Sequence, residues 1–311
     1  MKSEKIILIT GITGFVGQNL SIFLKKYFNV KGISRQESQE SVSYKFFFEK
    51  NLEYDAIIHL AGKAHDLKNV SNPQDYYDAN FELTKQLYDA FLISNSSVFI
   101  FMSTVKAVAD EVKGILDECE IPNPKTHYGI TKQQAEQYIL SKSLPIGKRV
   151  YILRPCMIHG PGNKGNLNLL YQLVSKKLPW PLGAFENQRS FLSIENLCFV
   201  IKELLDNTAA IPSGIYQVAD DQPVSTNELI QLLNTSLEKK TKIWKIHSSW
   251  IKGIAQVGDY LHLPLNSERL QKLTENYVVS NQKITTTIGK SMPVNAKAGL
   301  LKTFESFKKI K

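Results

Sequence analysis

Three side chains in the middle of the sequence have the types and spacing for acid–base chemistry. Tyr128 and Lys132 stand four residues apart in YGITK, at the start of an expected helix, and therefore on one face of it. A tyrosine with a pKa of about 10 is a poor base, but a neighbouring ammonium group favours the phenolate. Thr104 follows an apolar stretch, and its hydroxyl would hold a reacting oxygen. The pattern predicts a catalytic set in which Tyr128 exchanges a proton with an alcohol or sugar hydroxyl.

A second pattern, near the N-terminus, is typical of a dinucleotide site. Gly11, Gly14 and Gly17 are spaced GxxGxxG between an apolar strand-like stretch and an amphipathic helical segment. A turn glycine reverses the chain, a missing side chain lets backbone approach phosphate, and the helix N-terminus offers N–H groups to the anion. Glycines alone often mark only turns, so the flanking strand and helix carry the inference. A nicotinamide dinucleotide bound here would exchange hydride with the carbon whose hydroxyl Tyr128 deprotonates.

Strand-like and helix-like segments alternate through the first half of the chain. This alternation predicts an α/β fold with a doubly wound parallel sheet, because crossovers between parallel strands are right-handed. The carboxyl ends of parallel strands line the ligand crevice, so Thr104 and the glycine turn should open on the same side. The expected strands cover 6–10, 30–34, 56–60, 98–102 and 150–153, and the expected helices 17–27, 76–93 and 128–140.

The amino-acid composition of the sequence changes after Arg154. Residues 155–190 are rich in Gly, Pro and Asn, which is typical of loops around a ligand or of a small second lobe. Strands expected at 191–194 and 215–218 should return to the main sheet. The expected helices of this half cover 196–205 and 226–237, and a short strand is expected at 242–246.

A chain of 311 residues is long enough for one or two domains. We predict a dinucleotide-binding (Rossmann) domain made of residues 1–155 plus about 191–220. The remainder, about 156–190 plus 221–311, is the predicted smaller C-terminal substrate-binding lobe.

Composition excludes several other classes of protein. With 43% hydrophobic and 22% charged residues, the chain reads as an ordinary globular protein without a signal peptide or a membrane span. Three scattered cysteines form neither a metal pair nor an even disulfide set, so we expect no metal site and a cytoplasmic location. The net charge of +9 reflects either surface bias or attraction of anionic small molecules. Dispersed lysines argue against nucleic acid as a partner.

In these features the chain resembles the extended short-chain dehydrogenase/reductase family, which comprises nucleotide-sugar epimerases, dehydratases and reductases. The resemblance covers nearly the whole chain and implies Thr104, Tyr128 and Lys132 as the catalytic set, with Lys132 also bonding the nicotinamide ribose. It is carried by TGITGFVG at 10–17, HLAG at 59–62, DANFELTKQL around Asn80, STV at 103–105, YGITK at 128–132, LRPCMIHGPG at 153–162 and QRSFLSIENL at 188–197.

The resemblance also implies the remaining ligand contacts. Arg189 suits a nucleotide diphosphate because its donors form a fork, although a surface charge is the alternative. Asn80 is expected to be structural as much as cofactor-contacting. The implied substrate-binding residues are Thr104, Asn166, Leu182 and Arg189. The implied cofactor-binding residues are Gly11, Thr13, Gly14, Phe15, Val16, Ser34, Arg35, Leu60, Ala61, Gly62, Asn80, Tyr128, Lys132 and Pro155.

Departures from the family's patterns narrow the reaction. The 4,6-dehydratases carry an Asp-Glu pair directly after the catalytic threonine, whereas this chain has Val105 and Lys106 and so lacks that acid and base. The enzymes that make GDP-fucose have a cysteine after the Ser pair, where this chain again has Val105. Redox chemistry at one carbon remains. Residues 154–197 look most like reductases of UDP-4-keto-6-deoxy-N-acetylhexosamines in polysaccharide biosynthesis, so reduction is predicted first. The alternative is a UDP-sugar 4-epimerase that keeps NAD tightly bound.

The second strand indicates which cofactor is used. Enzymes specific for NAD typically place an acid at its end to bond the ribose hydroxyls, whereas an arginine accepts a 2′-phosphate. Ser34 and Arg35 therefore favour NADPH, although Glu37 keeps NAD open. A releasable NADPH fits a reductase better than an epimerase.

Three further points stay open at the level of sequence. His159 stands where the family usually has tyrosine, and His127, before Tyr128, is expected to be an exposed loop histidine. A non-enzymatic dinucleotide sensor is disfavoured because Tyr128 and Lys132 are both present. A homodimer through a four-helix interface, formed by 76–93 and 128–142, is the expected assembly. The apolar residues available for it, or for packing on the sheet, are Phe81, Leu87, Phe91, Tyr138 and Ile139.

Overall fold

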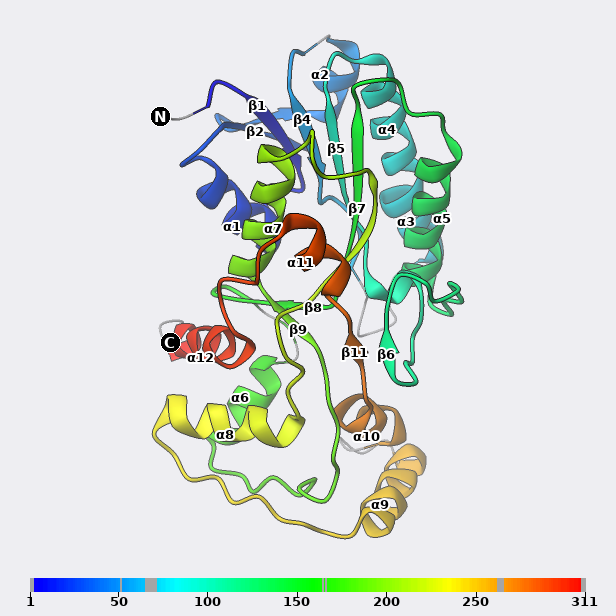
Figure 1. The fold of residues 1–311 in the computed structure, drawn as a ribbon. Helices are drawn as coiled ribbons and strands as arrows, with labels where there is room; N and C mark the ends of the chain where they lie inside the picture. Colours follow the sequence, from blue (N-terminus) through cyan, green and yellow to red (C-terminus); the bar gives the residue numbers. More distant parts are fainter. Residues whose placement is uncertain are drawn as a thin grey trace.

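A seven-stranded parallel sheet forms the centre of the computed structural model, which describes residues 3–50, 52–64, 72–163, 165, 167–261 and 266–308 (Figure 1). The predicted doubly wound sheet is confirmed. The first strand along the chain lies inside the sheet; the second and third strands follow on one side of it, and the later strands follow on the other side. The topological switch point therefore lies between the strands that are first and fourth in the sequence. The spatial order is β10 (Gly214–Val218), β7 (Arg149–Pro155), β5 (Val98–Met102), β4 (Ala56–His59), β1 (Ile6–Thr10), β2 (Asn29–Ser34) and β3 (Ser41–Ser43).

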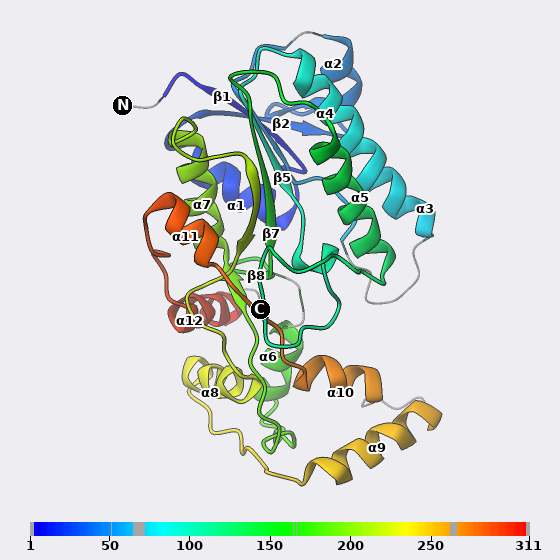
Figure 2. The same ribbon diagram turned by 45° about the vertical axis from the view of Figure 1, so that its right-hand side comes forward.

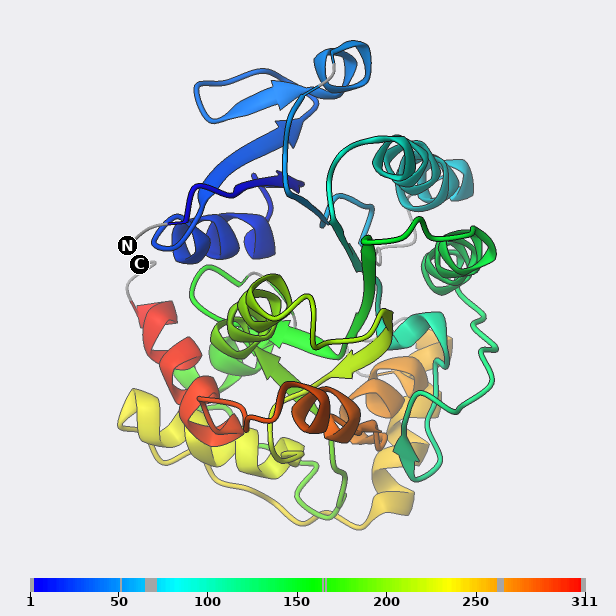
Figure 3. The same ribbon diagram turned by 45° about the horizontal axis from the view of Figure 1, so that its top comes forward.

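Helices cover both faces of this sheet. Every residue of β4 and β5 is buried, as expected for parallel strands that are enclosed on both faces. On one face lie α1 (Phe15–Leu24) and α7 (Ile194–Asp206), whose apolar residues pack against alternate strand residues. On the other lie α2 (Tyr44–Glu49), α4 (Leu83–Ile93) and α5 (His127–Ser141), as Figure 3 shows from above.

Two expectations about strands in the second half were wrong. The strand expected at 191–194 does not join the main sheet. Instead β9 (Phe191–Ser193) pairs in parallel with β8 (Met157–His159), which starts two residues beyond β7 and so lies past the carboxyl edge of the sheet. Residues 242–246 form only isolated bridges, from Ile243 to Trp180 and from Lys245 to Leu182.

The helix expected over 76–93 is divided into three parts. It begins as α3 (Pro73–Tyr76), where Asn72 caps the first turn, and ends as α4. Between them η1 (Tyr77–Glu82) is a π-helix, in which the hydrogen bonds span five residues. Such π-turns are frequent at functional sites, and this one contains Asn80.

A second hydrophobic core lies beyond the carboxyl ends of the strands (Figures 1 and 2). It is built from α6 (Leu167–Ser175), α8 (Thr226–Leu237), α9 (Ser248–Leu261), α10 (Ser267–Thr274) and α12 (Ala296–Phe307). In contrast, α11 (Gln282–Ile288) packs against β10, and its Ile284 belongs to the core under the sheet. A parallel pair of β6 (Ile115–Leu116) and β11 (Val278–Val279) completes the elements near the crevice. The division into residues 1–155 plus about 191–220 and about 156–190 plus 221–311 stays a prediction.

No helix in the described parts of the chain combines the length and the apolar character that a membrane crossing requires.

Candidate active site

The glycine turn after β1 has the shape of a phosphate cradle. Gly11 has a φ of +68°, and a Cβ there would lie 2.8 Å from the backbone nitrogen of Ala61, so no other residue fits without strain. The Gly14 N–H donates to the Gly11 carbonyl at 3.0 Å and closes the turn. Helix α1 begins after Gly14 without a side-chain cap. Its first N–H groups, from Phe15 and Val16, are therefore suited to an anion.

The loop after β4 is held against this turn by a buried polar network. The Thr10 hydroxyl bonds Nδ1 of His59 at 2.7 Å and accepts the N–H of Ala61 at 3.1 Å. Nε2 of His59 bonds the Thr84 hydroxyl at 2.9 Å. Burial, aided by Lys132, holds the pKa of His59 well below 6.5, so its ring is neutral at pH 7. Sequence reasoning missed the roles of Thr10 and His59, although each is the first residue of a quoted motif, TGITGFVG and HLAG.

Tyr128 and Thr104 meet where α5 approaches the end of β5. The first turn of α5 is capped by Thr126, whose hydroxyl accepts the N–H of Gly129. A Cβ on Gly129 would lie 2.4 Å from the Lys106 carbonyl oxygen, so only glycine allows this close packing. The contact brings α5 against η2 (Val105–Ala107), and Thr104 and Tyr128 are hydrogen-bonded.

The pKa of Tyr128 differs from the expectation. Burial raises it above the usual value of 10, Tyr76 raises it further, and the hydrogen bond with Thr104 acts in the opposite direction. Lys132 is not among the groups that shift it. In the chain alone, desolvation therefore outweighs the lowering that a neighbouring ammonium was expected to produce.

Lys132 lies buried on α5, one turn after Tyr128. Its Nζ donates to the Met102 carbonyl at 2.9 Å and sits 4.7 Å from the centre of the Phe101 ring. Burial lowers its pKa to about 8, while Glu136 acts to raise it. A Cβ on Gly62 would lie 3.2 Å from this Nζ, so the loop after β4 reaches the lysine. The structure thus brings Thr104, Tyr128 and Lys132 to the carboxyl edge where that loop ends.

A buried ion pair joins α5 to the strands behind it. Glu136, one turn after Lys132, receives Nη2 of Arg154 at 2.5 Å and Nε at 3.0 Å. It also accepts the hydroxyl proton of Ser103, the neighbour of Thr104. The pair joins α5, β5 and β7, with both side chains at most 3% exposed. Sequence reasoning did not single out either residue. Arg154 lies within the motif LRPCMIHGPG, and Glu136 follows the motif YGITK by four residues.

Asn80 connects the loop after β4 to α5 through hydrogen bonds of its side-chain amide. Its Oδ1 accepts the N–H of Lys63 at 2.8 Å, and its Nδ2 donates to the Lys63 carbonyl at 3.1 Å and to the Thr131 hydroxyl at 3.2 Å. Asn80 is fully buried. These bonds give Asn80 a structural role between the loop after β4 and α5. A direct cofactor contact stays a prediction.

The other predicted cofactor residues lie along the carboxyl edge of the sheet. Ser34 ends β2, and its hydroxyl is 3.0 Å from that of Ser41. Arg35 follows and is exposed, whereas the carboxylate of Glu37 accepts a hydrogen bond from Ser43 at 2.8 Å. Thr13 is exposed in the glycine turn, and Pro155 is buried at the end of β7. Leu60 and Ala61 belong to the loop after β4.

Two of the predicted substrate residues, Leu182 and Arg189, lie outside the central sheet. Arg189 donates to the Lys272 carbonyl at the end of α10 and lies 3.5 Å from Glu275. Leu182 is buried in the second core, so its side chain packs there rather than lining a crevice. Asn166 lies outside the described residues.

Lys106, two residues after Thr104, adds a cation near Arg189. Its Nζ donates to the Asp110 carbonyl at 2.7 Å and lies 4.3 Å above the Tyr277 ring. Burial lowers its pKa, Glu275 acts against that shift, and Arg189 reinforces it. Lys106 and Arg189 therefore share one electrostatic environment close to Thr104.

The two histidines that depart from the family pattern have different surroundings. His127 is exposed, as expected, although it begins α5 rather than lying in a loop. His159 is fully buried, with Nδ1 at 2.9 Å from the Thr303 hydroxyl and Nε2 at 3.4 Å from Asp220. It therefore joins β8 to α12. Among the residues with described positions, no group of three or more His, Cys, Asp or Glu side chains could hold a metal ion.

Comparisons with known proteins agree with this geometry. The profile of the NAD dependent epimerase/dehydratase family matches residues 7–219, which include the glycine turn and the predicted catalytic residues Thr104, Tyr128 and Lys132. A UDP-glucose 4-epimerase from Vibrio cholerae is 30% identical and aligns over 98% of this chain and 96% of its own. An N-acetyl-alpha-D-glucosaminyl-diphospho-ditrans,octacis-undecaprenol 4-epimerase from Escherichia coli O157:H7 is also 30% identical, over 89% and 84%.

The solved structures share the fold at lower identity. A UDP-N-acetylglucosamine 4-epimerase from Bacillus cereus superposes with a TM-score of 0.77 at 20% identity, covering 98% of this chain and all of the other. The structural match therefore extends beyond the sheet into the second lobe.

Proposed function

Because this chain belongs to the NAD dependent epimerase/dehydratase family and is an NAD(P)-dependent enzyme of nucleotide-sugar metabolism, we propose that it is a UDP-sugar 4-epimerase. The supporting observation is the hydrogen-bonded pair of Thr104 and Tyr128 beside buried Lys132, at the carboxyl edge of the sheet where the glycine turn also lies. The two relatives at 30% identity carry names of 4-epimerases, whereas a UDP-2-acetamido-2,6-beta-L-arabino-hexul-4-ose reductase from Pseudomonas aeruginosa is 22% identical. Epimerisation therefore takes precedence over the reduction predicted first from the sequence.

The residues at the crevice fit a dinucleotide. The turn at Gly11 and the uncapped start of α1 would hold the pyrophosphate, and the loop of Leu60 to Gly62 would face the adenosine ribose. When bound, NAD(P) supplies the acceptor and donor for the hydride that leaves and returns at C4 of the sugar. Lys132 would bond the nicotinamide ribose.

The chain's own residues handle the proton. Tyr128 takes the proton of the 4-hydroxyl as the hydride leaves C4, and it returns that proton when hydride is delivered to the opposite face. Thr104 bonds Tyr128 and would orient the same sugar oxygen. Oxidation and reduction then balance within one turnover, so the reaction consumes no cosubstrate.

Reduction of a 4-keto UDP-sugar is the second candidate, and the end of β2 favours it. Arg35 is exposed there, and the nearby carboxylate of Glu37 is engaged by Ser43. An arginine at this position suits the 2′-phosphate of NADPH, which a reductase must exchange after each turnover.

The product formed without added cofactor separates these candidates. Purified protein is incubated with UDP-glucose or UDP-N-acetylglucosamine, products are identified by NMR, and bound dinucleotide is released by heat and identified. The epimerase proposal predicts copurified NAD and a C4 epimer. Consumption of added NADPH by a 4-keto UDP-sugar, without epimer formation, would establish the reductase instead. Failure of both reactions would leave a dinucleotide sensor.

A further inference from the structure

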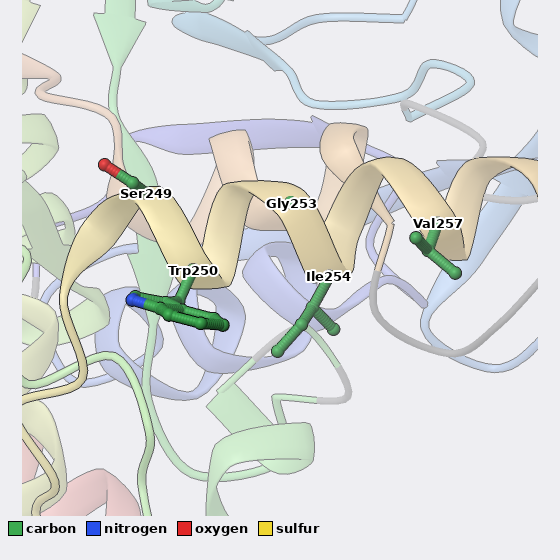
Figure 4. A pocket seen from close by; sticks show the side chains of 5 residues that line it. All are labelled: Ser249, Trp250, Gly253, Ile254 and Val257. Carbon is green, nitrogen blue, oxygen red and sulfur yellow. The ribbon is translucent and has the colours of Figure 1, made fainter.

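Helix α9 exposes a stripe of large apolar side chains. Trp250 is 73% exposed, Ile254 51%, Val257 53% and Leu261 57%. Their spacings of four, three and four residues place them on one side of the helix. Figure 4 shows Trp250, Ile254 and Val257 projecting along one side of the helix, where with Ser249 and Gly253 they line a surface pocket. We call Trp250, Ile254, Val257 and Leu261 the α9 stripe.

A different side of α9 packs against the rest of the lobe. Ile251, Ala255 and Gly258 are the buried residues of α9, and their spacing puts them about a quarter turn from the α9 stripe. Their burial anchors α9 to the lobe. The apolar arc of the helix is therefore wider than the surface that the lobe covers, and exposed apolar patches of this kind mark interaction sites.

Lysines are frequent in the segment that leads into α9. The 24 residues from Glu238 to Leu261 contain five lysines and two acidic residues. Lys240, Lys242 and Lys245 are exposed in the segment that leads into α9. Asp259 accepts hydrogen bonds from Ser267 at 2.9 and 2.5 Å, which lower its pKa and keep it charged, so five lysines against two acids leave this segment with a net charge of +3. This part of the surface thus combines a positive potential with apolar side chains.

Aromatic residues accompany the lysines. Trp244 is 49% exposed between Lys242 and Lys245, and Tyr260 at the end of α9 is 85% exposed. Tryptophan and tyrosine favour the boundary between lipid headgroups and acyl chains, where the ring is buried and the polar atom stays hydrated. Figures 1 and 2 both place α9 and the strand-free segment before it at the outer edge of the lobe, remote from the sheet.

We propose that the α9 stripe and its flanking lysines dock this enzyme on an anionic membrane surface, with α9 lying in the plane of the interface. An interfacial helix of this type buries its apolar face at the headgroup boundary while lysines contact acidic lipids. Docking by this surface goes beyond the reaction and does not depend on it. A symmetric contact between two copies is disfavoured, because it would bring the lysines of both copies together.

Vesicle sedimentation tests the docking surface. Full-length protein is mixed with vesicles of phosphatidylcholine alone or of phosphatidylcholine with phosphatidylglycerol, at low and high salt. The docking account predicts binding to the anionic vesicles that weakens at high salt. Trp250→Ser with Ile254→Ser should weaken binding at least about tenfold. Lys242→Gln with Lys245→Gln should weaken it by about 30-fold.

A matched control is provided by Ile93, which is 89% exposed at the end of α4 on the opposite side of the molecule from α9's lobe. Ile93→Ser should bind anionic vesicles like the parent protein. Thermal unfolding and turnover of a water-soluble UDP-sugar, measured on every variant, separate loss of docking from loss of folding or of the proposed reaction. No vesicle binding by the parent protein, or equal binding to neutral vesicles, would overturn the proposal. So would a stripe variant that binds normally but changes a dimer into a monomer.

Discussion

At the scale of single residues, the site depends on how burial changes ordinary acids and bases. Thr104, Tyr128 and Lys132 were predicted from their types and spacing, and the fold places them together. The direction of the pKa shifts could not be predicted, because it depends on tertiary burial. Desolvation raises the pKa of Tyr128 and lowers that of Lys132 to about 8.

The lysine's depressed pKa has a consequence for stability. In the unfolded chain Lys132 has the ordinary pKa of about 10.4, so between pH 8 and that value the unfolded state binds more protons. Lys132 therefore costs stability below pH 8, and this cost fades as the pH rises to its unfolded value. For Lys132→Met, we expect the free energy of unfolding relative to the parent to be higher at pH 7 than at pH 10.

Urea denaturation of both proteins at pH 7 and pH 10 measures this difference. If the stability of Lys132→Met relative to the parent instead improves as the pH rises, burial of the Lys132 ammonium does not destabilise the folded protein.

At the scale of elements, close contacts between neighbouring segments set the geometry. The strand positions and α8 were predictable from apolar runs, since these depend on local pattern. The pairing of β9 with β8 was not, because the partner of a three-residue strand is decided by distant packing. The π-turn around Asn80 was not predictable either, because it depends on where the amide finds its partners in Lys63 and Thr131.

The approach of α5 to η2 is one such contact. In Gly129→Ala, the new methyl group would meet the Lys106 carbonyl at 2.4 Å, so α5 must shift and carry Tyr128 away from Thr104. We expect turnover to fall about 100-fold, as for misplaced catalytic groups. Gly214→Ala is the control, because a Cβ there meets nothing within 4 Å. Steady-state kinetics on both variants decide, and equal activity would refute this role for Gly129.

The Glu136–Arg154 pair is the second such contact. Glu136→Gln leaves a buried guanidinium without its carboxylate, and we expect a loss of about 3–5 kcal/mol in unfolding free energy. Because Glu136 raises the pKa of Lys132, the same variant should also move the alkaline limb of the pH–rate profile to lower pH.

Replacing both partners separates charge from packing. Glu136→Leu with Arg154→Leu should recover much of the stability, because no unpaired charge remains. Chemical denaturation and pH–rate profiles report the two effects independently. An unchanged alkaline limb in Glu136→Gln would show that the pair stabilises the fold without acting on Lys132.

At the scale of the whole molecule, the proposed homodimer depends on the outer faces of α4 and α5. Leu87, Phe91 and Ile139 are buried in the sheet core, so three of the five apolar residues considered for the interface serve packing instead. Phe81 and Tyr138 remain, partly exposed, with their rings 6.3 Å apart. Sequence periodicity could not separate these roles, because both faces of a helix in such a layer carry apolar residues.

Phe81→Glu tests this assembly. A carboxylate repeated across a two-fold interface is costly, so we expect the variant to be monomeric where the parent is dimeric. Ile22→Glu, at a 68% exposed position on α1, is the control and should remain a dimer. Light scattering after size-exclusion chromatography measures both masses. A dimeric Phe81→Glu variant would place the interface elsewhere.

The most direct test of the whole account is Tyr128→Phe, which removes one hydroxyl from the crevice and leaves the ring in place. Turnover of the UDP-sugar and the dissociation constant of the dinucleotide are measured on the same preparations. We expect turnover to drop by about 10²–10⁴-fold with nearly unchanged dinucleotide affinity, because the phenol carries the proton and the glycine turn carries the phosphates. Parental turnover in Tyr128→Phe would contradict the assignment of the acid–base group.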